Sequence, residues 1–352
     1  MLNRFTLPTM VLLLGLVALI PVSCSSEKSP KGKAGLVDEV IDSVAATVVA
    51  GFSEASEAKA TTALEKSAPR ETGNFVFQVT DMLLVEPKLY AVYDGGVIVY
   101  DFDQKSQSLI PADERLTSLA LHEGNIYVGG AKLYTVSEPA LEPVEYNVVD
   151  TITSLYSYNY RLMIGTRSGL YSKSIFGPQE LFQDAPITAM VADENGLWVG
   201  TAGQGLYRWD GEEFHKRFLL RDTSLFDSVN CLDFKHHHVY VGTTNGLHIF
   251  NGGRWENLST GEGLPSNNVT AIDASQWVVY VGTDNGVVTY FNGEIAPVDK
   301  LEDRAVSNIR VRGRQLIAGT DYDGILLKSR RALKTLVQPV VDSSLNILSL
   351  IQ

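Results

Sequence analysis

Charged and aromatic side chains suited to binding a polar ligand or a partner occur at turns between short apolar segments. They combine carboxylates, guanidinium groups and one phenol, which hold polar groups through charge and hydrogen bonds. We expect them to gather at one rim of the fold. The alternative is that they have no binding role, because solvated turns favour Asp for its local hydrogen bonds. The candidate binding residues are Asp94, Arg167, Asp284, Asp303, Arg304, Asp321, Tyr322 and Asp323.

The remaining reactive side chains form no recognisable catalytic or metal-binding set. His236, His237 and His238 are consecutive, and successive strand residues point to opposite faces, so we do not expect them to bind one metal ion. Cys231 takes a position that Ser or Ala fills in other repeats, which predicts a packed thiol. No acid–base pair stands out. The sequence therefore predicts no catalytic residue, no metal and no cofactor.

These side chains are positioned by a repeat of about 38 residues. Its most regular part is a short strand that ends in Gly, as in Val239-Tyr240-Val241-Gly242 and Val279-Tyr280-Val281-Gly282. A short apolar run precedes this strand, and a Gly-containing turn and two further strands follow it. Four short antiparallel strands per repeat are typical of a propeller blade. The sequence predicts an all-β, seven-bladed β-propeller over residues 73–352.

The number of blades has an alternative. The apolar run that starts each repeat occurs eight times, first at 80–83 and last at 345–348. An eighth, incomplete blade could therefore form from residues 74–78 and 345–351. In either arrangement we expect the two ends of the repeat region to meet and overlap, because an unclosed sheet edge invites aggregation.

The best-formed repeat resembles the two-component regulator propeller repeat. Residues 263–272 read Gly-Leu-Pro-Ser-Asn-Asn-Val-Thr-Ala-Ile, and residues 279–287 read Val-Tyr-Val-Gly-Thr-Asp-Asn-Gly-Val. The pattern of the family is Gly-Leu-Pro-x-Asn-x-Val-x-x-Ile followed by Leu-Trp-Ile-Gly-Thr-x-x-Gly-Leu. The likeness extends over roughly residues 150–325, and Val92 and Gly130 depart from it in the first two repeats. It implies an extracytoplasmic, sensor-type propeller that offers a binding surface.

The first residues are typical of a targeting segment. Arg4 precedes an apolar run from Leu7 to Ile20, and Cys24 follows small residues, which resembles the lipobox of bacterial lipoproteins. Pro21 stands where that family prefers Leu. The resemblance implies a signal peptide over 1–23, a lipidated Cys24 with a tether over 24–34, and, from Ser25, sorting to the outer membrane. An uncleaved anchor or an ordinary signal peptide are the alternatives.

Residues 35–72 are predicted to form an amphipathic helix and a linker. Aliphatic residues recur there at three- and four-residue steps, from Leu36 to Phe52, which marks one face of a helix. This face needs a partner surface. The helix either packs on the propeller or mediates oligomerisation or docking.

Composition narrows the function. Lys and Arg number 29 against 41 Asp and Glu, for a net charge of −12, which argues against binding to nucleic acid. Two Cys in 352 residues exclude a disulfide scaffold. We expect a non-catalytic, lipid-anchored protein of the bacterial cell envelope, on its periplasmic or surface face, whose propeller binds an envelope protein. A propeller that binds or senses a glycan or small ligand is the alternative, and a propeller enzyme such as a lyase is the third.

Overall fold

The computed structural model describes residues 78–93, 95–146, 150–174, 177–217, 228–274 and 277–338. The chain divides into two units, Met1–Thr72 and Gly73–Gln352, and all described residues belong to the second. Several predictions therefore lie outside the described residues: the signal peptide, Cys24, the tether, the helix over 35–72, Asp94 and the run at 345–351. Within the described part, no helix has the length and apolar character needed to cross a bilayer.

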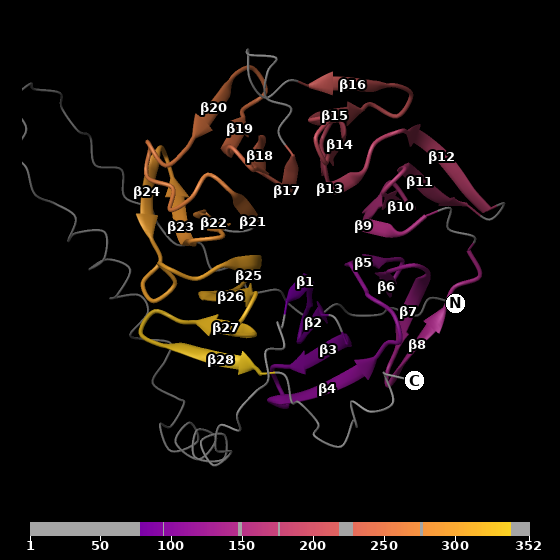
Figure 1. Cartoon of the computed structure of the whole chain (residues 1–352), viewed down its shortest axis with the longest axis horizontal. Coiled ribbons are helices and arrows are strands. Elements are labelled where there is room, and N and C mark those ends of the chain that lie inside the picture. Colours follow the sequence, from indigo (N-terminus) through magenta and orange to yellow (C-terminus); the bar gives the residue numbers. More distant parts are fainter. Residues whose placement is uncertain are drawn as a thin grey trace, which may run out of the picture. The chain divides into compact units, whose positions relative to one another are not determined.

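The described residues form seven four-stranded antiparallel sheets arranged in a ring, and each sheet consists of four consecutive strands (Figure 1). The predicted seven-bladed β-propeller is confirmed. The first strand of each blade lies nearest the central channel and the fourth lies at the outside (Figure 1).

Blades 1 to 4 comprise β1 (Val79–Val85), β2 (Lys88–Tyr93), β3 (Gly96–Asp101), β4 (Ser106–Pro111); β5 (Ser118–His122), β6 (Asn125–Gly129), β7 (Leu133–Ser137), β8 (Ala140–Pro143); β9 (Ile152–Tyr158), β10 (Arg161–Thr166), β11 (Gly169–Ser174), β12 (Gly177–Gln183); and β13 (Ile187–Asp193), β14 (Gly196–Thr201), β15 (Leu206–Trp209), β16 (Phe214–Arg217). Blades 5 to 7 comprise β17 (Val229–Lys235), β18 (His238–Thr243), β19 (Gly246–Phe250), β20 (Trp255–Leu258); β21 (Val269–Asp273), β22 (Val279–Thr283), β23 (Gly286–Phe291), β24 (Glu294–Pro297); and β25 (Val306–Arg312), β26 (Gln315–Thr320), β27 (Ile325–Lys328), β28 (Leu333–Val337).

The hydrophobic core lies in layers between neighbouring blades. Second strands are mostly apolar after their first residue because both of their faces are covered; every residue of β14 is buried, for example. One layer joins the two ends of the ring, where Val79, Met82 and Leu89 of blade 1 pack with Ile317 and Ile325 of blade 7. Burial between blades, rather than inside one blade, makes the ring the stable unit.

The Gly that ends the second strand is explained by close packing. A Cβ at Gly242 would lie 2.4 Å from Cys231 Sγ and 2.7 Å from Val269 of the next blade. Only a residue without a side chain fits between them. Cys231 fills this small space opposite Gly242 in the sheet, and burial raises the pKa of its thiol. The predicted packed thiol is confirmed.

A β-bulge near the start of the first strand positions a side chain that forms a hydrogen bond to the next blade. In six blades the pairing register with the second strand shifts at this point. A bulge re-aims the side chain at the shifted residue. Thr117 Oγ1, at the same place in blade 2, donates to the carbonyl oxygen of Ile152 at 2.7 Å, and Asn230 Nδ2 donates to that of Val269 at 2.9 Å. This hydrogen bond links six of the seven described blades to the next one; in blade 4 the equivalent hydroxyl, Thr188 Oγ1, is buried without a partner.

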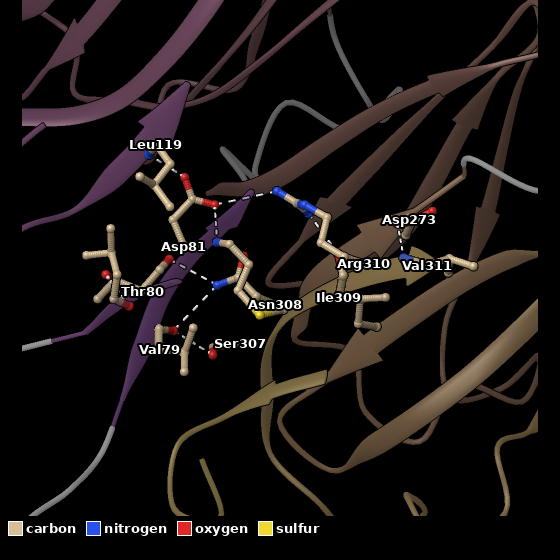
Figure 2. Close-up of polar contacts among 12 residues, drawn as sticks. Val79, Thr80, Asp81, Leu119, Asp273, Ser307, Asn308, Ile309, Arg310 and Val311 are labelled. Carbon is tan, nitrogen blue, oxygen red and sulfur yellow. Dashed lines mark hydrogen bonds and ion pairs between the residues drawn. The ribbon is translucent and has the colours of Figure 1, made fainter. Parts of the chain in front are cut away.

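The ring closes by the same contact. Ser307 Oγ of blade 7 donates to the carbonyl oxygen of Val79 at 2.7 Å, and Asn308 Nδ2 donates to that of Thr80 at 3.0 Å (Figure 2). All seven described blades are complete without a shared strand. The predicted overlap and the eighth blade would require residues 345–351, which lie outside the described residues.

Candidate functional site

The two faces of the ring carry different connections. Because consecutive strands are antiparallel, turns between second and third strands share one face with the blade-to-blade connections. We call this the connection face. The turns between first and second strands and between third and fourth strands lie on the opposite side, the turn face. All candidate residues predicted from the sequence that the structure describes lie on the connection face.

Blades 6 and 7 bring the candidate residues at the end of the sequence together. Arg304, in the β24–β25 connection, forms an ion pair with Asp323, in the β26–β27 turn. Arg304 Nε also donates to the carbonyl oxygen of Lys300 at 3.3 Å. The backbone N–H of Asp321 donates to the carbonyl oxygen of Ala305 at 3.4 Å. The turn is therefore fastened to the connection beside it, and Asp303 belongs to the same connection.

The β26–β27 turn is also braced from within. Thr320 Oγ1 donates to the carbonyl oxygen of Gly324 at 2.8 Å and accepts the backbone N–H of Asp323 at 2.9 Å. Burial raises the pKa of Asp321, which is partly enclosed. Tyr322, at the tip, is 74 % exposed. A phenol held out in solvent by a rigid turn can bind a partner with little loss of conformational entropy.

The other candidate residues do not join this group. Asp284, in the β22–β23 turn, accepts a hydrogen bond from Asn268 Nδ2 at 3.0 Å and braces its own blade. Arg167 lies in the β10–β11 turn of blade 3, and blades 4 and 5 separate it from blade 6. The structure therefore places Arg167 on the same face as the group in blades 6 and 7 but in a different part of the ring.

The wall of the channel contains polar residues that the sequence reasoning missed. The first strand of each blade is an edge strand, so its outward N–H groups need acceptors. The backbone N–H of Ala274 donates to Asp233 Oδ2 at 2.6 Å, and that of Val311 donates to Asp273 Oδ2 at 2.9 Å. In blade 3, Tyr156 Oη accepts the backbone N–H of Ala192, in the next blade, at 3.1 Å. The signal in the sequence was an acceptor at the fifth position of the first strand in blades 3, 5 and 6, namely Tyr156, Asp233 and Asp273.

In blade 7 that fifth position is Arg310. Its guanidinium lies 3.5 Å from Asp81 Oδ1, and Asp81 Oδ2 accepts the backbone N–H of Leu119 at 2.8 Å (Figure 2). Burial raises the pKa of Asp81, and Arg310 opposes that rise. Burial also raises the pKa of Asp233 to about 6, with a further contribution from the charge of Asp273. These carboxylates accept hydrogen bonds from backbone N–H groups of neighbouring blades, so they stabilise the contacts between blades.

The turn face presents a second set of exposed side chains. Trp277, in the β21–β22 connection, is 78 % exposed, and the ring of His236 stacks on it with centroids 5.1 Å apart. His237 Nδ1 lies 2.9 Å from Glu194 Oε1 of the neighbouring blade. Tyr160, in the β9–β10 turn, is 93 % exposed. Among the residues the structure describes, no three His, Cys, Asp or Glu side chains are placed to hold a metal ion.

Comparisons with known proteins support the fold. No family model matches the chain, and no curated protein matches it. Among solved structures, it is similar to the extracellular domain assigned to a hybrid two-component system of B. thetaiotaomicron, at 14 % identity and a TM-score of 0.63 over 75 % of this chain and 40 % of that one. An extracellular domain assigned to a one-component system of the same organism gives 19 % identity and a TM-score of 0.61, over 72 % of this chain and 38 % of that one.

The WD40 propeller domain of Doa1 is also similar, at 14 % identity and a TM-score of 0.54, over 72 % of this chain and 94 % of that one. This chain thus spans about two fifths of the length of the two B. thetaiotaomicron domains. At these identities the likeness establishes the propeller fold alone.

Proposed function

We propose that this chain is a non-catalytic binding module of a bacterial cell envelope, anchored through a lipidated Cys24, and that it binds a protein partner at the connection face of blades 6 and 7. The supporting observation is Tyr322, which is 74 % exposed at the tip of a turn braced by Thr320 and by the Arg304–Asp323 ion pair. Tyr is enriched at the residues that dominate binding energy in protein interfaces. An exposed Tyr between two carboxylates has no packing role that would explain it.

The charges around Tyr322 indicate the kind of partner. Basic residues in this area are Lys300, Arg304 and Lys328. Arg304 is already paired with Asp323, and Lys328 Nζ lies 3.5 Å from Asp299 Oδ2. The acidic residues of the connections and turns in these two blades are Asp284, Asp299, Glu302, Asp303, Asp321 and Asp323. Carboxylates in this excess attract a positively charged surface and accelerate its encounter. We therefore expect a partner with a basic patch around a pocket for the phenol.

Site-specific photo-crosslinking tests this proposal. A photoreactive amino acid at Tyr322 should crosslink one envelope protein in living cells, and the same amino acid at Tyr160 on the opposite face is the matched control. The protein captured through Tyr322 is then bound to wild type and to the Tyr322→Ala variant. We expect a loss of affinity of about tenfold or more, as for a dominant interface residue.

Tyr322→Ala should leave the free energy of unfolding within about 0.5 kcal/mol of wild type, because an exposed turn side chain contributes little. Equal crosslinking at Tyr322 and Tyr160 would contradict the proposal. So would an unchanged affinity of Tyr322→Ala for the captured protein.

A further inference from the structure

Exposed aromatic side chains stand at the tips of first-to-second turns on the turn face, away from the binding area proposed above. Tyr160 of blade 3 and Trp277 of blade 6 are 93 % and 78 % exposed. His236 of blade 5 is exposed as well and stacks on Trp277. Blades 4 and 5 separate the two largest tips, so they form spaced projections around the channel rather than one packed cluster.

In blades 3 and 5 the backbone of these turns does not favour the side chains that it carries. Tyr160 has φ 61°, and His236 and His237 have φ 51° and 61°. Tight hairpin turns of this kind prefer Asn and Gly, because positive φ is unfavourable for bulky residues. The equivalent turns of blades 2 and 7 do use Gly, at Gly124 with φ 79° and Gly313 with φ 58°. Aromatic side chains at strained tips point to a role in recognition rather than in the turn.

The charges beside the tips differ from those of the connection face. Arg161 follows Tyr160 directly, and Lys235 precedes His236. The carboxylate of Glu194 in the intervening blade is held by His237. The first-to-second turns of blades 3 and 5 are thus flanked by cations. The turn of blade 4 between them carries two carboxylates, Asp193 and Glu194, which are paired with Arg208 and His237. The connection face of blades 6 and 7 has an excess of carboxylates. A negatively charged surface is attracted to the turns of blades 3 and 5 and repelled by this connection face.

We propose that the turn face docks on the surface of a bilayer that contains anionic phospholipids, with Trp277 and Tyr160 inserted at the level of the headgroups. Trp and Tyr prefer this interfacial region because an apolar ring and a polar edge are both accommodated there. Juxtaposed Lys and Arg add attraction to anionic lipids. Separate aromatic projections suit a broad surface, whereas residues that dominate a protein interface gather near its centre. The inference rests on the proposed envelope location.

This orientation also accounts for the position of the acidic residues on the same face. The third-to-fourth turn of blade 4 carries Asp210, Glu212 and Glu213 at the outer edge of the ring. Repulsion there keeps the outer edge of blade 4 away from the bilayer, so that in this blade only the part near the channel approaches it. The connection face, with Tyr322, is then presented away from the bilayer to a partner.

Trp277 provides its own reporter. All four tryptophans lie in the described residues: Trp198 and Trp209 are buried, Trp255 is partly buried, and Trp277 alone is exposed. The full chain is mixed with vesicles of phosphatidylcholine and phosphatidylglycerol whose acyl chains carry bromine, which quenches nearby indoles. The emission of Trp277 is the difference between the emission of wild type and that of Trp277→Phe. If the indole lies at the interface, this emission should be at least about twofold lower on brominated vesicles than on unbrominated ones.

A matched control moves the indole to the other face. In the double variant Trp277→Phe with Tyr322→Trp, the added emission should not be quenched. Arg161→Gln with Lys235→Gln should weaken the quenching of Trp277 on vesicles with phosphatidylglycerol and leave it unchanged on pure phosphatidylcholine.

The proposal is overturned if Trp277 is not quenched, if the indole at 322 is quenched equally, or if the chain stays in the supernatant. It is also overturned if Trp277 is instead covered by an envelope protein in the absence of lipid. Binding through Tyr322 is measured without vesicles, so that proposal stands or fails separately.

Discussion

Replacing Asp233 by Asn should stabilise the ring at neutral pH. The carboxylate lies on the channel wall, where its Oδ2 accepts the backbone N–H of Ala274 at 2.6 Å. Burial and the neighbouring Asp273 outweigh this hydrogen bond and the attraction of Arg310, and raise the pKa from 3.8 to about 6. Asn keeps an acceptor oxygen for Ala274 and removes the charge. It gives up the hydrogen bond that the backbone N–H of Phe234 donates to Asp233 Oδ1 at 2.7 Å, which sets the gain below the full value of the shift.

The size and sign of the effect follow from this shift. The folded protein holds the proton of Asp233 more tightly than the unfolded chain does. The free energy of unfolding therefore falls as pH rises from about 4 to about 6, and the loss is complete above that range. A shift of about two units corresponds to roughly 3 kcal/mol. Asp233→Asn should be more stable than wild type by up to that amount at pH 8, and nearly equal to it at pH 4.

Urea unfolding followed by circular dichroism between pH 4 and pH 8 measures this difference. Asp233→Ala is the informative control, because it leaves the N–H of Ala274 without its acceptor and should destabilise the fold by about 1–3 kcal/mol at every pH. If Asp233→Asn destabilises the protein equally at pH 4 and pH 8, the carboxylate is not under strain in the folded state and the reasoning fails.

Three further changes test the packing, the closure and the anchor. Gly242→Ala places a Cβ 2.4 Å from Cys231 Sγ and should lower the free energy of unfolding by about 1–3 kcal/mol. Gly253→Ala is the control, because its Cβ would have no atom within 4 Å, and it should leave that free energy unchanged. Equal urea midpoints for the two variants would contradict the packing argument. Ser307→Ala removes the hydrogen bond from blade 7 to blade 1 and should cost about 1 kcal/mol, with a midpoint like that of wild type as the opposing result. Cys24→Ser should move the protein from the membrane fraction to the soluble fraction once membranes are washed with concentrated salt. Such a wash screens the attraction of Arg161 and Lys235 to anionic lipids and leaves acyl anchors in place. A variant that still sediments after cleavage and this wash would refute the lipid anchor.

Much of the fold was predictable from local sequence. Alternating apolar residues, a Gly at the end of each second strand and Gly-containing hairpin turns recur at a nearly constant interval, and they specify the four strands of a blade. Seven copies then require a ring, because a blade buries its faces only against its neighbours. The small residue at Cys231 was predictable for the same reason, since it stands opposite a Gly.

The arrangement of the functional surfaces was predictable only in part. The sequence placed Arg304, Tyr322 and Asp323 in loops on one face, yet it also grouped Arg167 with them, because loop positions say nothing about distance around a ring. The acceptors of the channel wall, such as Asp233, were missed, since each bonds a backbone group of the next blade. Strand periodicity and turn chemistry are local properties that the amino-acid sequence determines by itself. Contacts between side chains of different blades depend on ring closure and on the register between segments about 40 residues apart. Only the tertiary structure decides these contacts.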